Sequence, residues 1–176
     1  MQIPEFRRNL QIASYLNYLF EKAGLLAIVV GGHAVEIYTA GSYHTADVDL
    51  VLNGRNIAGS LLEEVGFDKS SDGRHWEHPE LNFAIEIPDD RLLGSMDRIN
   101  RVEIGDGFSV NVIGIEDLVM DRLRAYVYWQ SRGDGEWALF IMKAQKDRID
   151  FEYLETTAQS EGKDIYHALL ELKKEL

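Results

Sequence analysis

The chain has 176 residues and a formal net charge of −12 at pH 7, with 45% hydrophobic and 27% charged residues. This length predicts one domain, or one domain with a modest appendage, and a sizeable buried core. Because the sequence contains no cysteine, a disulfide framework, a cysteine-ligated metal and a cysteine nucleophile are all excluded. The acidic balance argues against non-specific binding of nucleic acid, although a bound cation or a local basic cluster could reverse the field in one pocket.

Two segments bear on localisation. The first ten residues, MQIPEFRRNL, lack the long apolar core of a signal peptide. The longest apolar run, Leu25 to Val30, is far too short to span a bilayer. We therefore expect a cytoplasmic protein with no membrane partner.

Hydrophobic periodicity predicts alternating helices and strands up to about Ile113. Glycines and prolines divide the segments, as at Gly24, which is placed to end the first helix. The expected elements are a helix from Pro4 to Ala23, a strand at 25–30, a short helix at 34–40, a loop at 41–46, a strand at 47–52, a helix capped by Asn53 and reaching Val65, a hairpin or irregular loop at 67–83, a strand at 83–87 and a hairpin of 101–104 with 108–113.

From Ile115 onward the sequence predicts helices. A break is expected at Gly133 to Gly135, and a further helix is expected after Asp150, which is placed as its cap. Tyr126, Trp129 and Trp137 are expected to pack between helices. The fold class is therefore α/β (α+β), with a mixed sheet flanked by helices in a core of residues 1–114. A C-terminal helical segment, residues 115–176, is expected to pack on that core.

The stretch from Leu25 to Leu52 carries the chemistry. In a strand, Asp47 and Asp49 point to the same side, about 6.6 Å apart along the backbone, so both carboxylates can converge on one or two Mg²⁺ ions. Glu86 alternates with the apolar residues of another predicted strand and is the candidate third carboxylate. Gly31 and Gly32 lie at a strand-to-helix turn, where backbone N–H groups can approach phosphate oxygens.

Other interpretations of these residues are weaker. Asp47 and Asp49 could simply face water at a strand edge, and Glu86 could be an ordinary solvent-facing residue. Phosphatases of the haloacid-dehalogenase type place a similar pair at the end of an apolar strand and need a Thr two residues later, where this chain has Val51. His75 and His78 lie three apart in a segment without a helical pattern, so they need not converge on a metal.

Gly-Gly, a short helix and Thr-x-Asp-x-Asp before an apolar strand together resemble the nucleotidyltransferase fold of the polymerase-beta type. The resemblance is to its minimal members, including abortive-infection toxins. It covers Ile28 to Leu52 closely and Glu86 loosely, and it extends weakly to residues 115–126. That family transfers a nucleoside monophosphate from an NTP to a hydroxyl group with Mg²⁺.

The resemblance implies roles for individual residues. Gly31 and Gly32 would hold the triphosphate, and Asp47, Asp49 and Glu86 would bind metal, with Glu86 or Asp49 accepting the hydroxyl proton. Further candidates for nucleotide binding are His33, which could instead pack in the short helix, Thr45, and as a basic partner of the phosphates Arg122 or Arg124. The chain departs from the family at four places, with Gly32 where many relatives have Ser, Tyr43 where Arg is frequent, and Glu86 where Asp is common. The fourth is in the helix after the core, where relatives often have a Lys near position 122 and this chain offers Arg122 or Arg124.

Two hypotheses of different class follow. The leading one is a Mg²⁺-dependent nucleotidyltransferase that uses ATP or GTP and a hydroxyl of a protein or small molecule, with nucleic acid less favoured by the acidic surface. The alternative is a catalytically inactive module of the same fold that binds a nucleotide or a protein, for instance within a toxin–antitoxin pair. The sequence is compatible with a homodimer but does not determine the oligomeric state.

Overall fold

The computed structural model describes residues 5–45 and 47–176. Pro4, expected in the first helix, and residue 46, expected in the loop at 41–46, lie outside the described residues. The helices are α1 (Glu5–Lys22), α2 (Gly31–Tyr38), α3 (Arg55–Glu64), α4 (Ile115–Tyr128), α5 (Arg132–Ala144), α6 (Phe151–Glu161), α7 (Lys163–Lys173) and the 3₁₀ turn η1 (Met96–Arg98). The strands are β1 (Ile28–Val30), β2 (Asp47–Val51), β3 (Asp68–Lys69), β4 (His75–His78), β5 (Phe83–Glu86), β6 (Asn100–Gly105) and β7 (Phe108–Val112).

The strands form one seven-stranded sheet in the order β3-β4-β5-β2-β1-β7-β6. β2 is antiparallel to β1 and parallel to β5, and β1 is parallel to β7. The outer strands are joined as antiparallel neighbours. The sheet is therefore mixed and lies among helices, which confirms the fold class predicted from the sequence.

Strand alternation sets which side of the sheet is polar. Val48 and Leu50 of β2 are buried, whereas Asp47 and Asp49 are partly exposed on the other side. β5 follows the same pattern, with Phe83 and Ile85 buried and Glu86 partly exposed. Because side chains in a strand alternate between faces, burial of the apolar residues holds the acidic ones on the accessible face.

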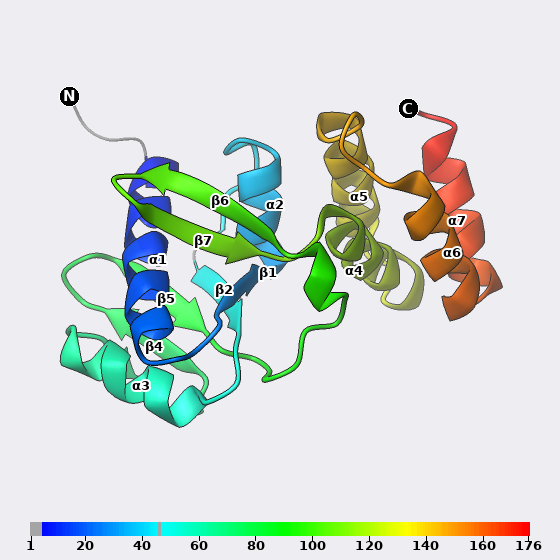
Figure 1. Ribbon diagram of the computed structural model, residues 1–176. Coiled ribbons are helices and arrows are strands. Elements are labelled where there is room, and N and C mark those ends of the chain that lie inside the picture. The colour runs from blue at the N-terminus through cyan, green and yellow to red at the C-terminus, as the bar shows by residue number, and fades with distance from the viewer. Residues whose placement is uncertain (1–4, 46) are drawn as a thin grey trace.

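Helices pack on the sheet, and further helices lie beside it (Figure 1). α1 packs across β7, and α2 packs against β1 and β2 and also touches α4 and α5. Helices α4 to α7 pack on one another beside the sheet. Among the described residues, no helix is long and apolar enough to cross a membrane.

Two buried carboxylates in the first turn of α4 connect the sheet region with the C-terminal helices. Glu116 accepts a hydrogen bond of 2.8 Å from the amide of Asp150 and lies 3.4 Å from the guanidinium of Arg98. Asp117 accepts from the amide of Ser95 at 2.7 Å and from the hydroxyl of Tyr153 at 2.9 Å. Negative charge is also favoured at the N-terminal end of a helix, so these contacts stabilise the junction.

The structure differs from the predicted elements in several places. β1 begins at Ile28 rather than at residue 25, because the amide of Leu25 still bonds to the carbonyl of Phe20 at the end of α1. The third helix is preceded by Gly54 rather than Asn53. Trp129, expected to pack between helices, is 83% exposed.

The predicted break at Gly133 to Gly135 was wrong, since both glycines lie inside α5. The reason for Gly135 is contact with α4. A Cβ atom at that position would lie 2.8 Å from a ring carbon of Tyr126, whereas one at Gly133 would meet nothing within 4 Å. Gly135 thus permits close approach of the two helices.

This difference between the glycines is testable by substitution. Gly133→Ala should raise the free energy of unfolding by up to about 0.5–1 kcal/mol, because alanine favours the helix. Gly135→Ala should lower it by about 1 kcal/mol or more, because the added methyl displaces the Tyr126 ring. Urea unfolding of both variants measures the two effects, and equal responses would contradict the observed packing of α4 on α5.

Candidate active site

Polar residues from neighbouring strands form a row across the accessible face of the sheet. In the strand register, His75 of β4 lies opposite Glu86 of β5, Glu86 lies opposite Asp49 of β2, and Asp49 lies opposite Val30 of β1. Asp47 stands two residues before Asp49 on the same strand. The prediction that Glu86 belongs to a strand beside the aspartates is therefore confirmed by the topology.

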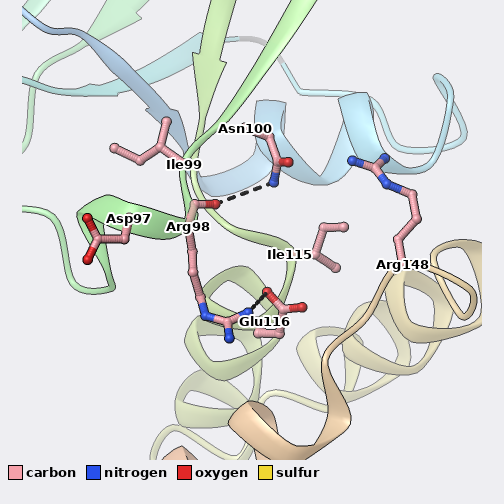
Figure 2. A pocket seen from close by; sticks show the side chains of 7 residues that line it. All are labelled: Asp97, Arg98, Ile99, Asn100, Ile115, Glu116 and Arg148. Atoms are coloured by element: carbon pink, nitrogen blue, oxygen red, sulfur yellow. Dashed lines mark hydrogen bonds and ion pairs between the residues drawn. The ribbon is translucent and has the colours of Figure 1, made fainter.

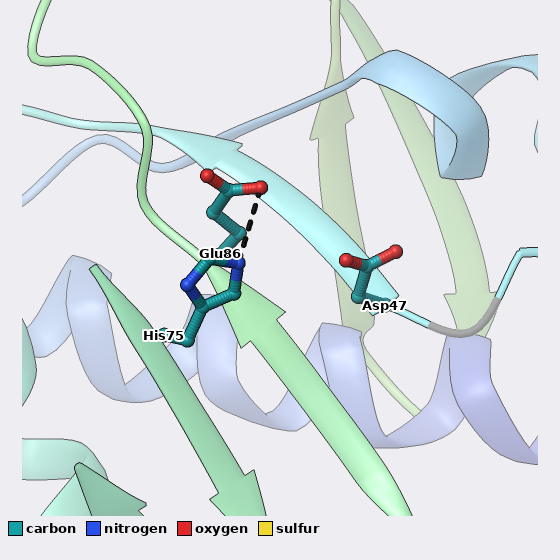
Figure 3. A group of neighbouring side chains, drawn as sticks. All are labelled: Asp47, His75 and Glu86. Atoms are coloured by element: carbon teal, nitrogen blue, oxygen red, sulfur yellow. Dashed lines mark ion pairs between the residues drawn. The ribbon is translucent and has the colours of Figure 1, made fainter. Parts of the chain in front are cut away.

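Three of these side chains converge on one point (Figure 3). One ligand atom each from Asp47, His75 and Glu86 lie within 4.8 Å of one another. The imidazole Nε2 of His75 is 3.4 Å from a carboxylate oxygen of Glu86. Carboxylate oxygens and an imidazole nitrogen are common ligands of divalent cations, so this donor set fits such an ion.

His75 was not predicted as a site residue, because it was considered only together with His78. The structure separates the two histidines: the ring of His78 packs edge-on against Phe67, away from the cluster. His75 could have been found by counting residue pairs across the hairpin. If His78 pairs with Phe83 across a short turn, three further steps along the antiparallel strands place His75 opposite Glu86, as observed.

The glycine turn meets Asp49 directly. Gly31 has φ +59, and a Cβ atom built on it would lie 2.1 Å from a carboxylate oxygen of Asp49. The following amide, that of Gly32, donates a hydrogen bond to the same carboxylate. Asp49 therefore lies against the first turn of α2, while Asp47 is gathered with Glu86 and His75.

Thr45 and Tyr43 lie on the other side of the turn. A Cβ atom at Gly32 would be 3.0 Å from a ring carbon of Tyr43 and 3.1 Å from the hydroxyl oxygen of Thr45. That hydroxyl donates to a carboxylate oxygen of Asp47 at 3.1 Å. Thr45 thus bridges the glycine turn and Asp47, whereas Tyr43 is a neighbour that sequence reasoning noted only as a departure from the family.

The pKa of Asp49 is raised to about 6. Burial is the main cause, and the negative charges of Asp47 and Glu86 add to it. The Gly32 hydrogen bond and the positive charge of Arg122 act in the opposite direction. Such a raised value is typical of a carboxylate that is removed from water beside other carboxylates.

The two arginines proposed as phosphate partners differ in position. Arg122 lies near enough to Asp49 to affect its pKa, and its guanidinium donates to Asp134 at 2.8 Å and to Asp121 at 2.6 Å. Arg124 instead donates from its Nε to Glu161 at 2.8 Å. Of the two, Arg122 is therefore the one whose charge acts on the site.

His33, a predicted nucleotide contact, is completely buried. Its Nδ1 lies 2.9 Å from a carboxylate oxygen of Glu36, which is itself buried. Of its two alternative roles, the structure therefore shows packing within α2. Contact of His33 with a nucleotide stays a prediction.

A separate cavity of about 600 Å³ lies where η1 and β6 meet α4 (Figure 2), and its lining includes Arg98, Asn100, Glu116 and Arg148. Here Arg98 is held by Glu116 and donates to Asp150 at 2.6 Å. None of the predicted site residues lines this cavity.

No protein-family model and no curated protein sequence matches the chain. Solved structures do. An antigenic nucleotidyltransferase-like protein from Paracoccidioides brasiliensis matches with a TM-score of 0.72 and 17% identity, over 96% of this chain and 88% of that one. ANT(2")-Ia in complex with adenylyl-2"-tobramycin matches with a TM-score of 0.57 and 14% identity, over 84% of this chain and 92% of that one.

The solution structure of the antibiotic-resistance factor ANT(2'')-Ia also matches, with a TM-score of 0.54 and 15% identity over 94% of this chain and 98% of that one. These likenesses define the class of protein: the chain has the nucleotidyltransferase fold. The family resemblance drawn from the sequence is thereby confirmed at the level of fold. Because the identities are low, the roles of individual residues remain predictions.

The contact between Gly31 and Asp49 can be tested with a matched glycine. Gly31→Ala should destabilise the protein by more than Gly73→Ala, because both positions have positive φ but only position 31 lacks space for a methyl group. The backbone strain alone is about 1–2 kcal/mol. Chemical denaturation measures both variants, and an equal loss would contradict the contact.

The pKa of Asp49 predicts a pH dependence of stability in protein kept free of metal with a chelator. The folded value, about 6, lies above the ordinary value of 3.8, so the folded state binds more protons between these values and loses stability as the pH rises through them. Asp49→Asn should therefore gain roughly 1–3 kcal/mol in free energy of unfolding relative to wild type between pH 4 and pH 7.

The measurement is chemical denaturation of both proteins at several pH values. Asp68→Asn, at an exposed position on β3, provides the control. A difference between Asp49→Asn and wild type that stays constant with pH would contradict the raised pKa.

Proposed function

We propose that the protein is a nucleotidyltransferase that uses a divalent cation, expected to be Mg²⁺, to transfer an NMP from ATP or GTP to a hydroxyl group. The observation that carries this proposal is the juxtaposition of the glycine turn with the carboxylate row. Gly31 and Gly32 lie against Asp49, and Asp49 lies opposite Glu86 and two residues from Asp47. The shared fold supports this activity by analogy.

The residues of this chain suit separate parts of such a reaction. Asp47, Asp49 and Glu86 would hold the cation, which when bound would supply positive charge for the phosphates. The glycine turn would accept the triphosphate, with Thr45 beside it and Arg122 as an additional positive charge. Glu86 or Asp49 would take the proton of the attacking hydroxyl, and a carboxylate whose pKa is raised towards neutrality suits that role.

The interaction of Asp49 with the Gly32 amide suggests an order of events. In the absence of ligand, the carboxylate uses a backbone donor that a phosphate would also use. If Asp49 held the cation together with Asp47 and Glu86, the Gly32 amide would be free to donate to a phosphate oxygen. We therefore expect cation and nucleotide to bind cooperatively.

For the acceptor we propose a small molecule that carries a hydroxyl group. ANT(2")-Ia, which shares the fold, has been solved with adenylyl-2"-tobramycin, so a chain of this architecture can accommodate a nucleotidylated small molecule. The net charge of −12 opposes a nucleic-acid acceptor. A protein acceptor remains the alternative outcome of the labelling experiment described below.

The second candidate function is binding of a nucleotide or a partner protein without catalysis, as in a toxin–antitoxin pair. The observation in its favour is that the guanidinium of Arg122 is already paired with Asp121 and Asp134. If Arg122 stays paired with these aspartates, its charge is less available to the phosphates, which favours binding of a nucleotide without transfer. Homodimerisation likewise remains a proposal.

Thermal unfolding tests the site without knowledge of the acceptor. An NTP at about 100 times its Kd should stabilise the protein by about 2.7 kcal/mol, or roughly 5–10 °C for a chain of this size. We expect this shift only when NTP and Mg²⁺ are both present, because the carboxylates need the cation to approach the phosphates. Asp47→Asn should abolish it, whereas Asp106→Asn, in the turn between β6 and β7, should not.

Transfer is then measured with an NTP labelled at the α-phosphate and a cell extract separated into low-molecular-weight and protein fractions. The proposal expects label in the small-molecule fraction, dependent on Asp49. Label in the protein fraction would replace the acceptor class. A metal-dependent thermal shift without any labelling would favour the inactive binding module, and absence of any shift would contradict a nucleotide site.

A further inference from the structure

The cluster in Figure 3 contains a histidine that the proposed reaction does not use. His75 comes from β4, outside the stretch of residues 25–52 that suggested a nucleotide site. Its ring is 30% exposed and lies beside Glu86, whose side chain is 22% exposed. The pair can therefore be reached from solvent.

The turn before β4 fixes the orientation of His75. A carboxylate oxygen of Asp72 accepts hydrogen bonds from the amides of Arg74 and His75, and the other carboxylate oxygen bonds to the ring Nδ1 of His75. Three hydrogen bonds thus fix the Asp72 carboxylate beside the ring. With Nδ1 engaged by this carboxylate, Nε2 is directed away from the turn.

Nε2 is directed at the carboxylate row. It lies 3.4 Å from a Glu86 oxygen, beyond the usual 2.7–3.2 Å of a hydrogen bond. Ligands that share one cation at about 2.0–2.2 Å lie roughly 3–3.5 Å from each other. The separation thus matches two ligands of one ion better than a direct hydrogen bond.

We propose that His75 is a nitrogen ligand of the divalent-cation site, positioned by Asp72, and that one position of the site consequently prefers a transition-metal dication to Mg²⁺. The inference deepens the proposed function and rests on it, since it assumes a cation between Asp47 and Glu86. A histidine that binds a metal commonly donates its other ring N–H to a carboxylate, which is the relation between His75 and Asp72. Imidazole binds later transition metals well, whereas Mg²⁺ takes oxygen ligands.

A purely electrostatic role for His75 is the competing explanation. The hydrogen bond to Asp72 is the main reason that the pKa of His75 is raised, and a protonated ring beside Glu86 would neutralise negative charge. The two roles predict opposite effects of removing the ring. Loss of a neutralising cation would strengthen or leave unchanged the binding of every dication, whereas loss of a nitrogen ligand weakens transition metals selectively.

The experiment is calorimetric titration of the full chain with Co²⁺ and with Mg²⁺ at one fixed pH, without nucleotide. We expect Co²⁺ to bind more tightly than Mg²⁺, and His75→Ala to reduce the ratio of the two affinities at least tenfold, mainly by weakening Co²⁺. Asp72→Asn should also weaken Co²⁺, by about 10–100-fold. An asparagine can still accept the amide hydrogen bonds of the turn, so this variant keeps the fold and tests the proposal even if His75→Ala does not fold.

His78→Ala is the matched control, because it removes a histidine from the same strand but outside the cluster. Thermal unfolding without metal shows whether each variant is folded, and the visible absorption of bound Co²⁺ should change only when His75 or Asp72 is replaced. If the wild-type protein binds both ions and the affinity ratio is the same in His75→Ala and His78→Ala, this inference is overturned and the proposed function stands. If the wild type binds neither ion without nucleotide, this inference is overturned, whereas the proposed function is decided by the thermal shift with NTP and Mg²⁺ together.

Discussion

Repulsion between carboxylates held on one face of the sheet is the constraint around which the structure is arranged. Asp47, Asp49 and Glu86 are kept together by strand pairing, and the pKa of Asp49 is raised mainly by burial and further by the charges of Asp47 and Glu86. Positive or hydrogen-bonding groups surround the row: the amide of Gly32 on one side, Arg122 from α4 and His75 from β4. A protein that needed only a stable sheet would separate such charges, so their placement favours a site over a solvated edge.

The hydrophobic face supplies the rigidity that this arrangement requires. Val48, Leu50, Phe83 and Ile85 are buried behind the acidic residues, and slipping one strand by a single residue would exchange the two faces. The same elements also connect the row with the C-terminal helices, since α2 begins at the glycine turn and packs against α4 and α5. The charge of Arg122 therefore reaches Asp49 from a part of the chain more than seventy residues away in sequence, and the helical segment contributes to the electrostatics of the site.

Local patterns predicted much of this from the sequence. Alternation along β2 and β5 identified the acidic face, and the glycines indicated the turn, because these signals depend on neighbouring residues alone. What the sequence analysis missed depends on pairing and packing between segments, even where a short turn joins them. His75 gains its position from β4 lying beside β5, and burial of His33 depends on the packing of α2. The glycines of α5 were misleading for the same reason, since Gly135 is explained by the ring of Tyr126 on another helix.

The strands β3 and β4 form a small unit at one side of the sheet, and the glycine turn lies across the row from it. A substitution at position 75 would change the side chain that this unit presents to the carboxylate row without altering the backbone of the glycine turn. The side chain beside Glu86 and the turn at Gly31 therefore belong to separate parts of the sheet and can be altered independently.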